Sequence, residues 1–135
     1  DTSERDSLFQ AESRRCKDII DIISNNGDKT RHFCIFDELY SGTNPEEATK
    51  AGTVFIDYLS KRSNVDFILT THYFKICKQF RKSCKIDNYK MDVKVLENGE
   101  FLYKYRLHKG ISKLKGAIRV LKDLNYPEEI LKELE

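Results

Sequence analysis

Two short apolar segments with a helical segment between them restrict the possible fold of this chain more than any other sequence feature. The first, residues 31–38, ends in the acidic pair Asp37-Glu38, and the second, residues 65–71, stops at His72. Continuous apolar runs of this length are typical of strands that are buried on both faces of a parallel sheet. The order strand, helix, strand predicts a βαβ unit with two parallel strands and a right-handed crossover.

The helix between these strands has a strong start signal. Asn44 can cap the helix with its side chain, Pro45 suits the first turn, and two glutamates follow where the helix dipole favours acidic groups. The apolar spacing extends the helix to about Lys61. The residues that it should bury are Ala48, Ala51, Phe55 and Leu59.

Two further helices are expected beside this unit. Residues 7–24 carry apolar side chains close to a helical period, and a turn sequence of Asn, Asn, Gly and Asp follows them. A helix of about two turns is expected from Tyr73.

The last third of the chain predicts a hairpin followed by helices. Residues 91–95 and 101–105 alternate between polar and apolar side chains around the turn sequence Glu97-Asn98-Gly99. One helix should run from about Ser112 to Leu124, and another should follow Pro127. The residues that these two helices should bury are Ile118, Leu121, Ile130, Leu131 and Leu134.

The composition is that of an ordinary globular protein. The chain has 135 residues, 39% hydrophobic and 34% charged, which is enough for one modest core. Its net charge of +2 neither favours nor excludes nucleic acid, because non-specific DNA binding needs a concentrated basic face. No apolar segment is long enough to cross a bilayer, so we expect no membrane association. The first residue is Asp1, not methionine, so we expect the chain to be cut from something longer.

The four cysteines have no spacing that is typical of a metal site. Cys16 and Cys34 lie within apolar periods and are expected to be buried as small hydrophobic residues. Free thiols are typical of a reduced compartment, so we expect an intracellular protein, in the cytoplasm or the nucleus.

Polar residues at the ends of the two predicted strands are the strongest candidates for chemistry. Ligands of open α/β sheets bind at the carboxyl ends of the strands. There, Asp37 could hold Mg²⁺ and Glu38 could orient and deprotonate a water, a combination that suits phosphoryl transfer. His72 would lie at the same sheet edge as Glu38 and could donate to a phosphate. The alternative, that two acids only mark a strand end, is about equally plausible from this motif alone.

Four motifs taken together resemble the ATPase domain of MutS-type DNA mismatch repair proteins, which belong to the ABC-type ATPase superfamily. They occur in the order and approximate spacing of that family, and the segment after the hairpin is also similar to it. The motifs are Ser7-Leu8-Phe9-Gln10-Ala11-Glu12, Phe36-Asp37-Glu38, Ser41-Gly42-Thr43-Asn44 and Thr71-His72-Tyr73. The resemblance implies a P-loop NTPase-like α/β fold of the ABC type, as a half-domain with parallel strands, an appended hairpin and C-terminal helices.

The resemblance also implies a role for each motif residue. Ser7 matches the signature serine that reaches the nucleotide of a partner subunit, Asp37 the Walker B metal-site acid, and Glu38 the catalytic base. His72 matches the switch histidine. The residues of the loop that crosses the dimer interface beside the nucleotide are Ser41, Gly42, Thr43 and Asn44. The implied cofactors are ATP and Mg²⁺ in the intact protein, and the implied partners are a second MutS-like subunit, in a homo- or heterodimer, and DNA bound by other domains.

Two departures from the family pattern limit these implications. The family usually has Gly-Arg-Gly-Thr after the acidic pair, whereas this chain has Tyr40-Ser41-Gly42-Thr43, which suggests a divergent branch, viral or paralogous. None of the six glycines begins the pattern G-x-x-x-x-G-K-[ST], so the phosphate-binding Walker A loop is missing. We therefore expect the parent protein to hydrolyse ATP and this chain to be inactive alone.

On this basis residues 1–135 are expected to form a single domain, the C-terminal portion of a MutS-like ATPase domain. Residues 1–88 would contain the signature helix, the Walker B strand, the D-loop, a helix and the H-loop strand, and residues 89–135 the hairpin and helical tail. Two other functions stay open. The chain could be a non-catalytic dimerisation or interaction module, or it could belong to another ABC-type DNA-repair ATPase.

Overall fold

The chain divides into two compact units, Asp1–Asp87 and Asn88–Glu135. The structure, a computed structural model, describes residues 2–113 and 116–134. No helix within these described ranges is long and apolar enough to span a membrane.

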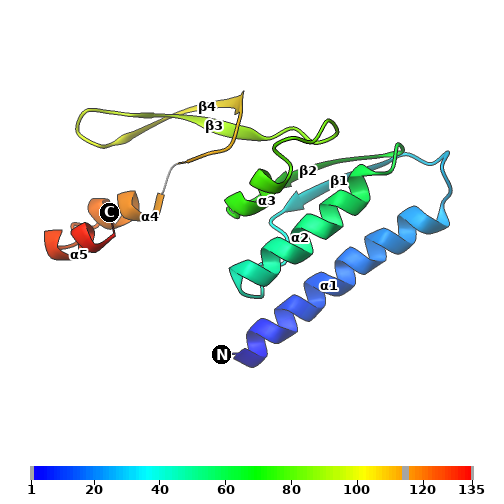
Figure 1. The fold of residues 1–135 in the computed structure, drawn as a ribbon. Helices are drawn as coiled ribbons and strands as arrows, with labels where there is room; N and C mark the ends of the chain where they lie inside the picture. The colour runs from blue at the N-terminus through cyan, green and yellow to red at the C-terminus, as the bar shows by residue number, and fades with distance from the viewer. Residues whose placement is uncertain (1, 114–115, 135) are drawn as a thin grey trace. The chain divides into compact units, whose positions relative to one another are not determined.

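The first unit contains the predicted βαβ arrangement (Figure 1). Helix α1 is followed by two parallel strands with a helix between them, and a short helix ends the unit. The elements are α1 (Thr2–Asn25), β1 (His32–Asp37), α2 (Pro45–Ser60), β2 (Val65–Thr70) and α3 (Phe74–Gln79). The strands pair in parallel from His32↔Val65 to Asp37↔Thr70, so the predicted strand direction is confirmed.

One face of the β1–β2 pair packs on the helices and forms the core of this unit. Phe36 and Val65 point into this core, and the rings of Phe36 and Phe55 meet edge to face with centroids 5.5 Å apart. Such aromatic pairs add to the free energy gained by burying their area. The buried residues of the core are Cys16, Ile23, Phe36, Leu39, Phe55, Ile56, Leu59, Val65, Ile76 and Phe80.

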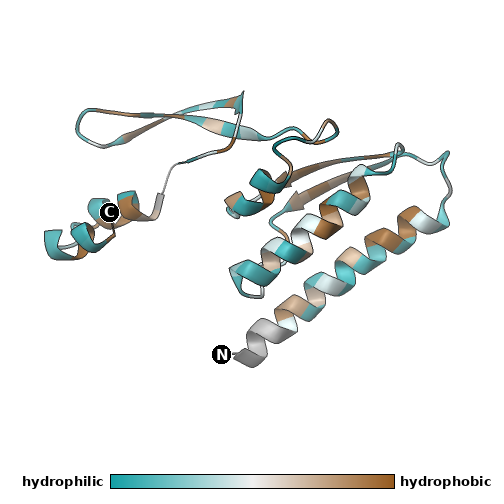
Figure 2. Ribbon diagram, in the orientation of Figure 1, coloured by the Kyte–Doolittle hydropathy of each residue, from teal (hydrophilic) through white to brown (hydrophobic). Residues whose placement is uncertain are grey.

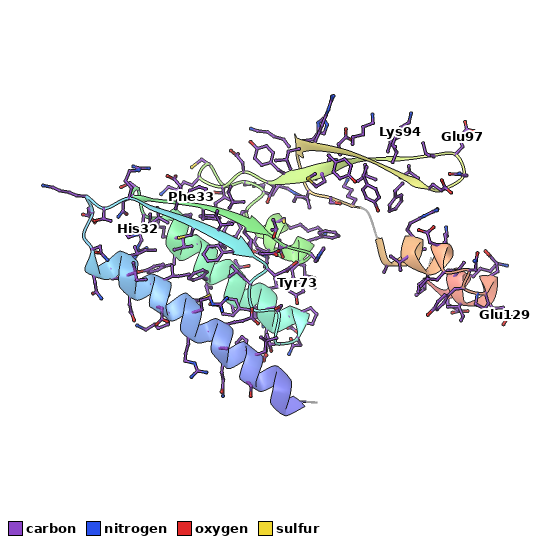
Figure 3. The ribbon with its side chains drawn as sticks, turned by 180° about the vertical axis from the view of Figure 1, so that it is seen from behind. His32, Phe33, Tyr73, Lys94, Glu97 and Glu129 are labelled. Carbon is purple, nitrogen blue, oxygen red and sulfur yellow. The ribbon has the colours of Figure 1, made fainter. Side chains whose placement is uncertain are left out.

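The other face of the β1–β2 pair is open within the described part of the chain, so the prediction of strands buried on both faces is wrong there. Phe33, Ile35 and Ile68 are 62%, 73% and 53% exposed. Figure 2 shows the apolar character of both strands, and Figure 3 shows the unit from the opposite side. The apolar run shows which residues gain free energy from burial. It carries no information on what covers each face of the β1–β2 pair.

Helix α2 begins as the sequence predicts. The Asn44 side chain accepts a hydrogen bond from the Glu47 amide at 2.9 Å, and Pro45 occupies the first turn. Ala48, Phe55 and Leu59 are buried as expected. Ala51 is only half-buried, so its predicted place in the core is wrong. Gly52 is buried instead, and a Cβ at this position would lie 2.9 Å from the Ile76 side chain of α3.

The substitution Asn44→Ala removes the cap of α2. It is expected to lower the free energy of unfolding by about 1 kcal/mol, because the Glu47 amide loses its acceptor. Urea denaturation followed by circular dichroism measures the change. Asn44→Asp keeps an acceptor at the same position and serves as the control. Equal stability of the alanine and aspartate variants would contradict the capping role.

The second unit contains the predicted antiparallel hairpin and two short helices. Its elements are β3 (Tyr89–Val95), β4 (Phe101–Lys109), α4 (Gly116–Asp123) and α5 (Glu128–Glu133). The register shifts between Met91 and Val93, where β4 contains additional residues and Tyr105 has a φ of 55°. This irregularity interrupts the alternation along β4, and the strand continues beyond it to Lys109.

The helical tail departs from the sequence prediction in two ways. Ser112 and Lys113 are irregular rather than helical, so the predicted helix start at Ser112 is wrong, and α4 begins at Gly116. Leu131 is buried as expected. The other residues that were expected to be buried are half-buried (Ile118, Leu121) or exposed (Ile130 at 45%, Leu134 at 43%).

None of the four cysteines forms a disulfide. Cys16 is buried as expected, whereas Cys34 is only half-buried. Burial raises the pKa of the Cys16, Cys34 and Cys77 thiols, which reduces their thiolate fraction at neutral pH. Within the described ranges, no group of three or more histidine, cysteine, aspartate or glutamate residues could hold a metal ion.

Candidate functional site

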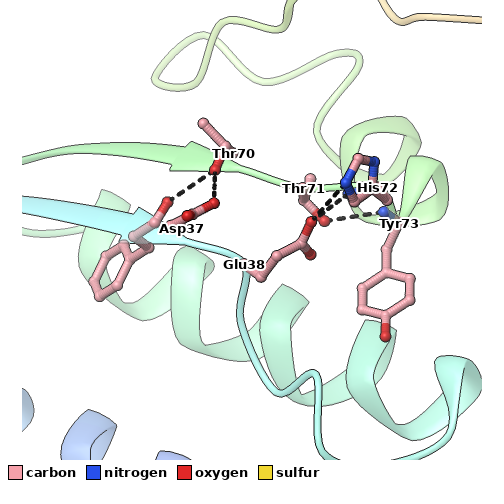
Figure 4. A network of polar contacts seen from close by, with 7 residues as sticks. Asp37, Glu38, Thr70, Thr71, His72 and Tyr73 are labelled. Atoms are coloured by element: carbon pink, nitrogen blue, oxygen red, sulfur yellow. Dashed lines mark hydrogen bonds and ion pairs between the residues drawn. The ribbon is translucent and has the colours of Figure 1, made fainter.

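The carboxyl ends of β1 and β2 meet at one edge of the first unit, and the acidic pair lies there (Figure 4). Asp37 pairs with Thr70 across the two strands, and the Thr70 hydroxyl donates to Asp37 Oδ1 at 2.8 Å. The Glu38 amide donates to the Thr70 carbonyl at 2.8 Å, which continues the ladder by one bond. These bonds fix the backbone from which both carboxylates project.

The Glu38 carboxylate faces His72, as the sequence predicted from the parallel strands. Glu38 Oε1 accepts a hydrogen bond from the His72 amide at 3.1 Å, and it lies 3.5 Å from His72 Nε2. The Glu38 side chain is 24% exposed, whereas that of His72 is 94% exposed. The carboxylate is thus held by the backbone of the neighbouring strand end, while the imidazole can reach a group in solution.

The backbone after β1 adopts an unusual conformation at two residues that are not glycine. Glu38 has a φ of 67° and Tyr40 a φ of 56°, both in the left-handed region, which costs roughly 1–2 kcal/mol for each such residue. Leu39 between them is only 4% exposed and anchors the turn in the core. Backbone strain of this kind persists where the surroundings hold it and is concentrated at functional sites.

The Tyr40 side chain packs against the core of the first unit. Its ring packs edge to face on Phe55 with centroids 6.4 Å apart. Burial, and then a hydrogen bond with Cys16, raises the pKa of the Tyr40 phenol, so this side chain stays neutral at physiological pH. Tyr40 therefore contacts Phe55 of α2 and Cys16 of α1, and these two contacts hold the strained turn in place.

The four loop residues with an expected nucleotide role lie in two different environments. The amides of Ser41 and Gly42 donate to the Glu12 carboxylate of α1. The Thr43 hydroxyl donates to Glu47 Oε2 at 2.8 Å, and Asn44 caps α2. The first two residues thus contact α1, and the last two form the start of α2.

Ser7 is exposed on α1, near its amino-terminal end. The hydrogen bonds that the described residues form with Asp37 and Glu38 do not include Ser7. The structure therefore joins Asp37 with Thr70 and Glu38 with His72, and it leaves Ser7 outside this group.

Glu12 is part of a sequence motif and Tyr40 directly precedes one, but sequence reasoning gave neither residue a role. No local signal could assign Glu12, because its contacts are to residues that are 29 and 30 positions away. For Thr70, the sequence did contain a signal, because this residue lies at the end of the second predicted strand. The observed register pairs it with Asp37.

The sequence matches the protein family described as MutS domain V over residues 1–135. The chain belongs to this family. It is 31% identical to a DNA mismatch repair protein MutS of Aquifex pyrophilus over 111 residues, which cover 82% of this chain and 13% of the relative. It is also 32% identical to an endonuclease MutS2 of Caldicellulosiruptor saccharolyticus over 121 residues, which cover 88% of this chain and 14% of the relative.

A second endonuclease MutS2, from Clostridium kluyveri, is 31% identical over 122 residues, which cover 89% of this chain and 14% of that protein. This MutS domain V chain thus spans about one seventh of the length of the curated relatives that it matches. The matches to MutS and MutS2 proteins have similar identity, so similarity alone does not favour one of the two groups.

Asp37 fits a magnesium site only if other groups complete it. Mg²⁺ in nucleotide sites keeps several waters and binds one or two carboxylates together with the phosphates of the substrate. Asp37 offers a single carboxylate oriented by the Thr70 hydroxyl, and the described ranges contain no group of three or more histidine, cysteine, aspartate or glutamate residues that could hold a metal ion.

Proposed function

We propose that this MutS domain V chain is the C-terminal part of an ATP-hydrolysing domain with a P-loop NTPase-like fold, in a MutS-type DNA repair protein. The observation that carries the proposal is the contact between Glu38 and His72 at the ends of two parallel strands, directly after Asp37. A candidate metal ligand, a candidate general base and a candidate hydrogen-bond donor to a phosphate then lie at one sheet edge.

In this proposal Asp37 would contribute one carboxylate to hold Mg²⁺ on ATP, and the metal would neutralise charge on the phosphates. Glu38 would accept a proton from the water that attacks the terminal phosphorus, and the bond from this phosphorus to the bridging oxygen would break to release ADP. Its described contacts use Oε1, so Oε2 is the oxygen that would take this proton. The His72 side chain is 94% exposed, and its imidazole would donate a hydrogen bond to the terminal phosphate.

The remaining parts of the ATP site must come from outside this chain. The Walker A pattern is absent from the sequence, so other residues would bind the phosphates. Ser7 would contact the nucleotide of a second MutS-like subunit, in a homo- or heterodimer, and Ser41 and Gly42 would lie at the same interface. Hydrolysis would change the state of a clamp on DNA, which other domains bind. An intracellular location follows from a role on DNA.

The proposal is tested by the dependence of ATP hydrolysis on Mg²⁺ in the full-length protein. Asp37→Asn is expected to raise the Mg²⁺ concentration at half-maximal hydrolysis by about tenfold or more, because an amide replaces the metal-binding carboxylate. Asp66→Asn, an exposed aspartate on β2, is the matched control and should not change this concentration.

Two results would contradict the proposal. Hydrolysis that is independent of Mg²⁺ would exclude the proposed role of Asp37. Absence of ATP hydrolysis by the full-length protein, under conditions where it is folded, would exclude an ATPase altogether.

A further inference from the structure

The Glu12 carboxylate forms a two-point contact between α1 and the loop that follows the acidic pair. The Ser41 amide donates to Glu12 Oε2 at 3.0 Å, and the Gly42 amide donates to Oε1 at 2.8 Å. The Ser41 hydroxyl also lies 3.3 Å from Oε1. Hydrogen bonds to an ionised carboxylate are about twice as strong as those between neutral groups, so this contact fixes the loop on the helix.

Gly42 allows the loop to approach α1 more closely than any other residue could. A Cβ at Gly42 would lie 2.7 Å from the Phe9 amide nitrogen and 2.9 Å from Leu8 Cγ. Leu8 and Phe9 directly follow Ser7, so the loop touches the helix beside the signature serine.

An aromatic contact fixes the same loop at a second point. The Phe9 ring of α1 lies 5.8 Å from that of Tyr40, centroid to centroid. Tyr40 is one of the two residues with positive φ in the turn, and the other is Glu38. A movement of α1 at Ser7 would therefore be transmitted through Phe9 and Glu12 to the strained turn that carries Glu38.

We propose that Glu12 is a positioning residue that couples Ser7 to Glu38 through the loop amides of Ser41 and Gly42. The inference rests on the proposed function, in which Ser7 contacts the nucleotide of the partner subunit and Glu38 acts on the nucleotide of its own subunit. Glu12 then connects the two nucleotide sites of a dimer. Binding of ATP at one site would change the position of the base at the other.

The contact itself is tested first in the 135-residue chain, without reference to ATP. In Glu12→Gln one carboxylate oxygen becomes an amide nitrogen, which cannot accept from the loop. Hydrogen exchange of the Ser41 and Gly42 amides should become about tenfold faster, while that of the Glu38 amide on Thr70 should not change. Asp21→Asn removes an exposed acid from the same helix and should leave all three amides unchanged.

The coupling is tested by a double-mutant cycle in the full-length protein, with kcat and KM for ATP as readouts. Ser7→Ala and Glu12→Gln should each lower kcat by about tenfold to a hundredfold through misplacement of the reacting groups, with KM unchanged. If Glu12 transmits the effect of Ser7, the double variant is no slower than the slower single variant.

A merely structural role of Glu12 gives a different result, because the two losses would then multiply in the double variant. That result, in a protein whose unaltered form hydrolyses ATP, overturns the coupling and leaves the proposed function intact. Absence of hydrolysis in the unaltered protein overturns the proposed function and the coupling with it. Unchanged exchange at Ser41 and Gly42 in Glu12→Gln overturns the contact on which the inference depends.

Discussion

Glu38→Gln in the full-length protein is expected to lower the rate of ATP hydrolysis about a thousandfold and to leave ATP binding intact, within the range of general-base effects. Glutamine has nearly the same shape as glutamate, and its carbonyl oxygen can still accept from the His72 amide. The variant therefore keeps the geometry of the strand ends. It loses only the carboxylate that would accept a proton from the attacking water.

Single-turnover hydrolysis and equilibrium binding of ATP, measured on the same preparation, separate these two effects. Glu97→Gln, in the hairpin turn, makes the same chemical change in the second unit and should leave both quantities unchanged. A variant at Glu38 that turns over at the unaltered rate would remove this residue as the base. A variant that no longer binds ATP would instead show that Glu38 contributes to the binding of ATP in the ground state.

Leu59→Ala is expected to lower the free energy of unfolding by about 2–5 kcal/mol, a large part of the stability of a small domain. The Leu59 side chain is fully buried at 0% exposure, between α2 and the β1–β2 pair. Truncation removes its transfer free energy and leaves a cavity that close-packed neighbours fill only in part.

Urea denaturation of the 135-residue chain, followed by circular dichroism, measures this loss. Val54→Ala is a matched control on the same helix, because Val54 is 68% exposed, and it should change the free energy of unfolding by less than about 0.5 kcal/mol. Similar losses in the two variants would show that α2 does not pack on the strands through Leu59.

Much of the first unit could be predicted from the sequence, because local signals and the fold agree there. Asn44 and Pro45 predict the start of α2, and the observed cap confirms it. The apolar segments and their end points predict that Glu38 and His72 lie at the same sheet edge, and the parallel register confirms this too. In both cases the signal lies within short segments of the sequence.

Features that depend on contacts between distant residues could not be predicted. The open face with Phe33 and Ile35 depends on what lies beside the sheet, and the choice of Gly52 over Ala51 for the core depends on Ile76 of α3. The hydrogen bonds from the Ser41 and Gly42 amides to Glu12 depend on the close approach of the loop to α1, which only the folded backbone shows. The chemical roles of Asp37, Glu38 and His72 stay predictions.

The two sheets differ in how early each can form during folding. His32 pairs with Val65, and 65 − 32 = 33 positions separate these partners, so the parallel ladder must wait for a long loop to close. The β3–β4 hairpin, by contrast, closes around a turn at Glu97 to Gly99, and such hairpins form within about 1–10 μs. On a ribosome, β1 would therefore stay without its partner strand until residue 70 has emerged.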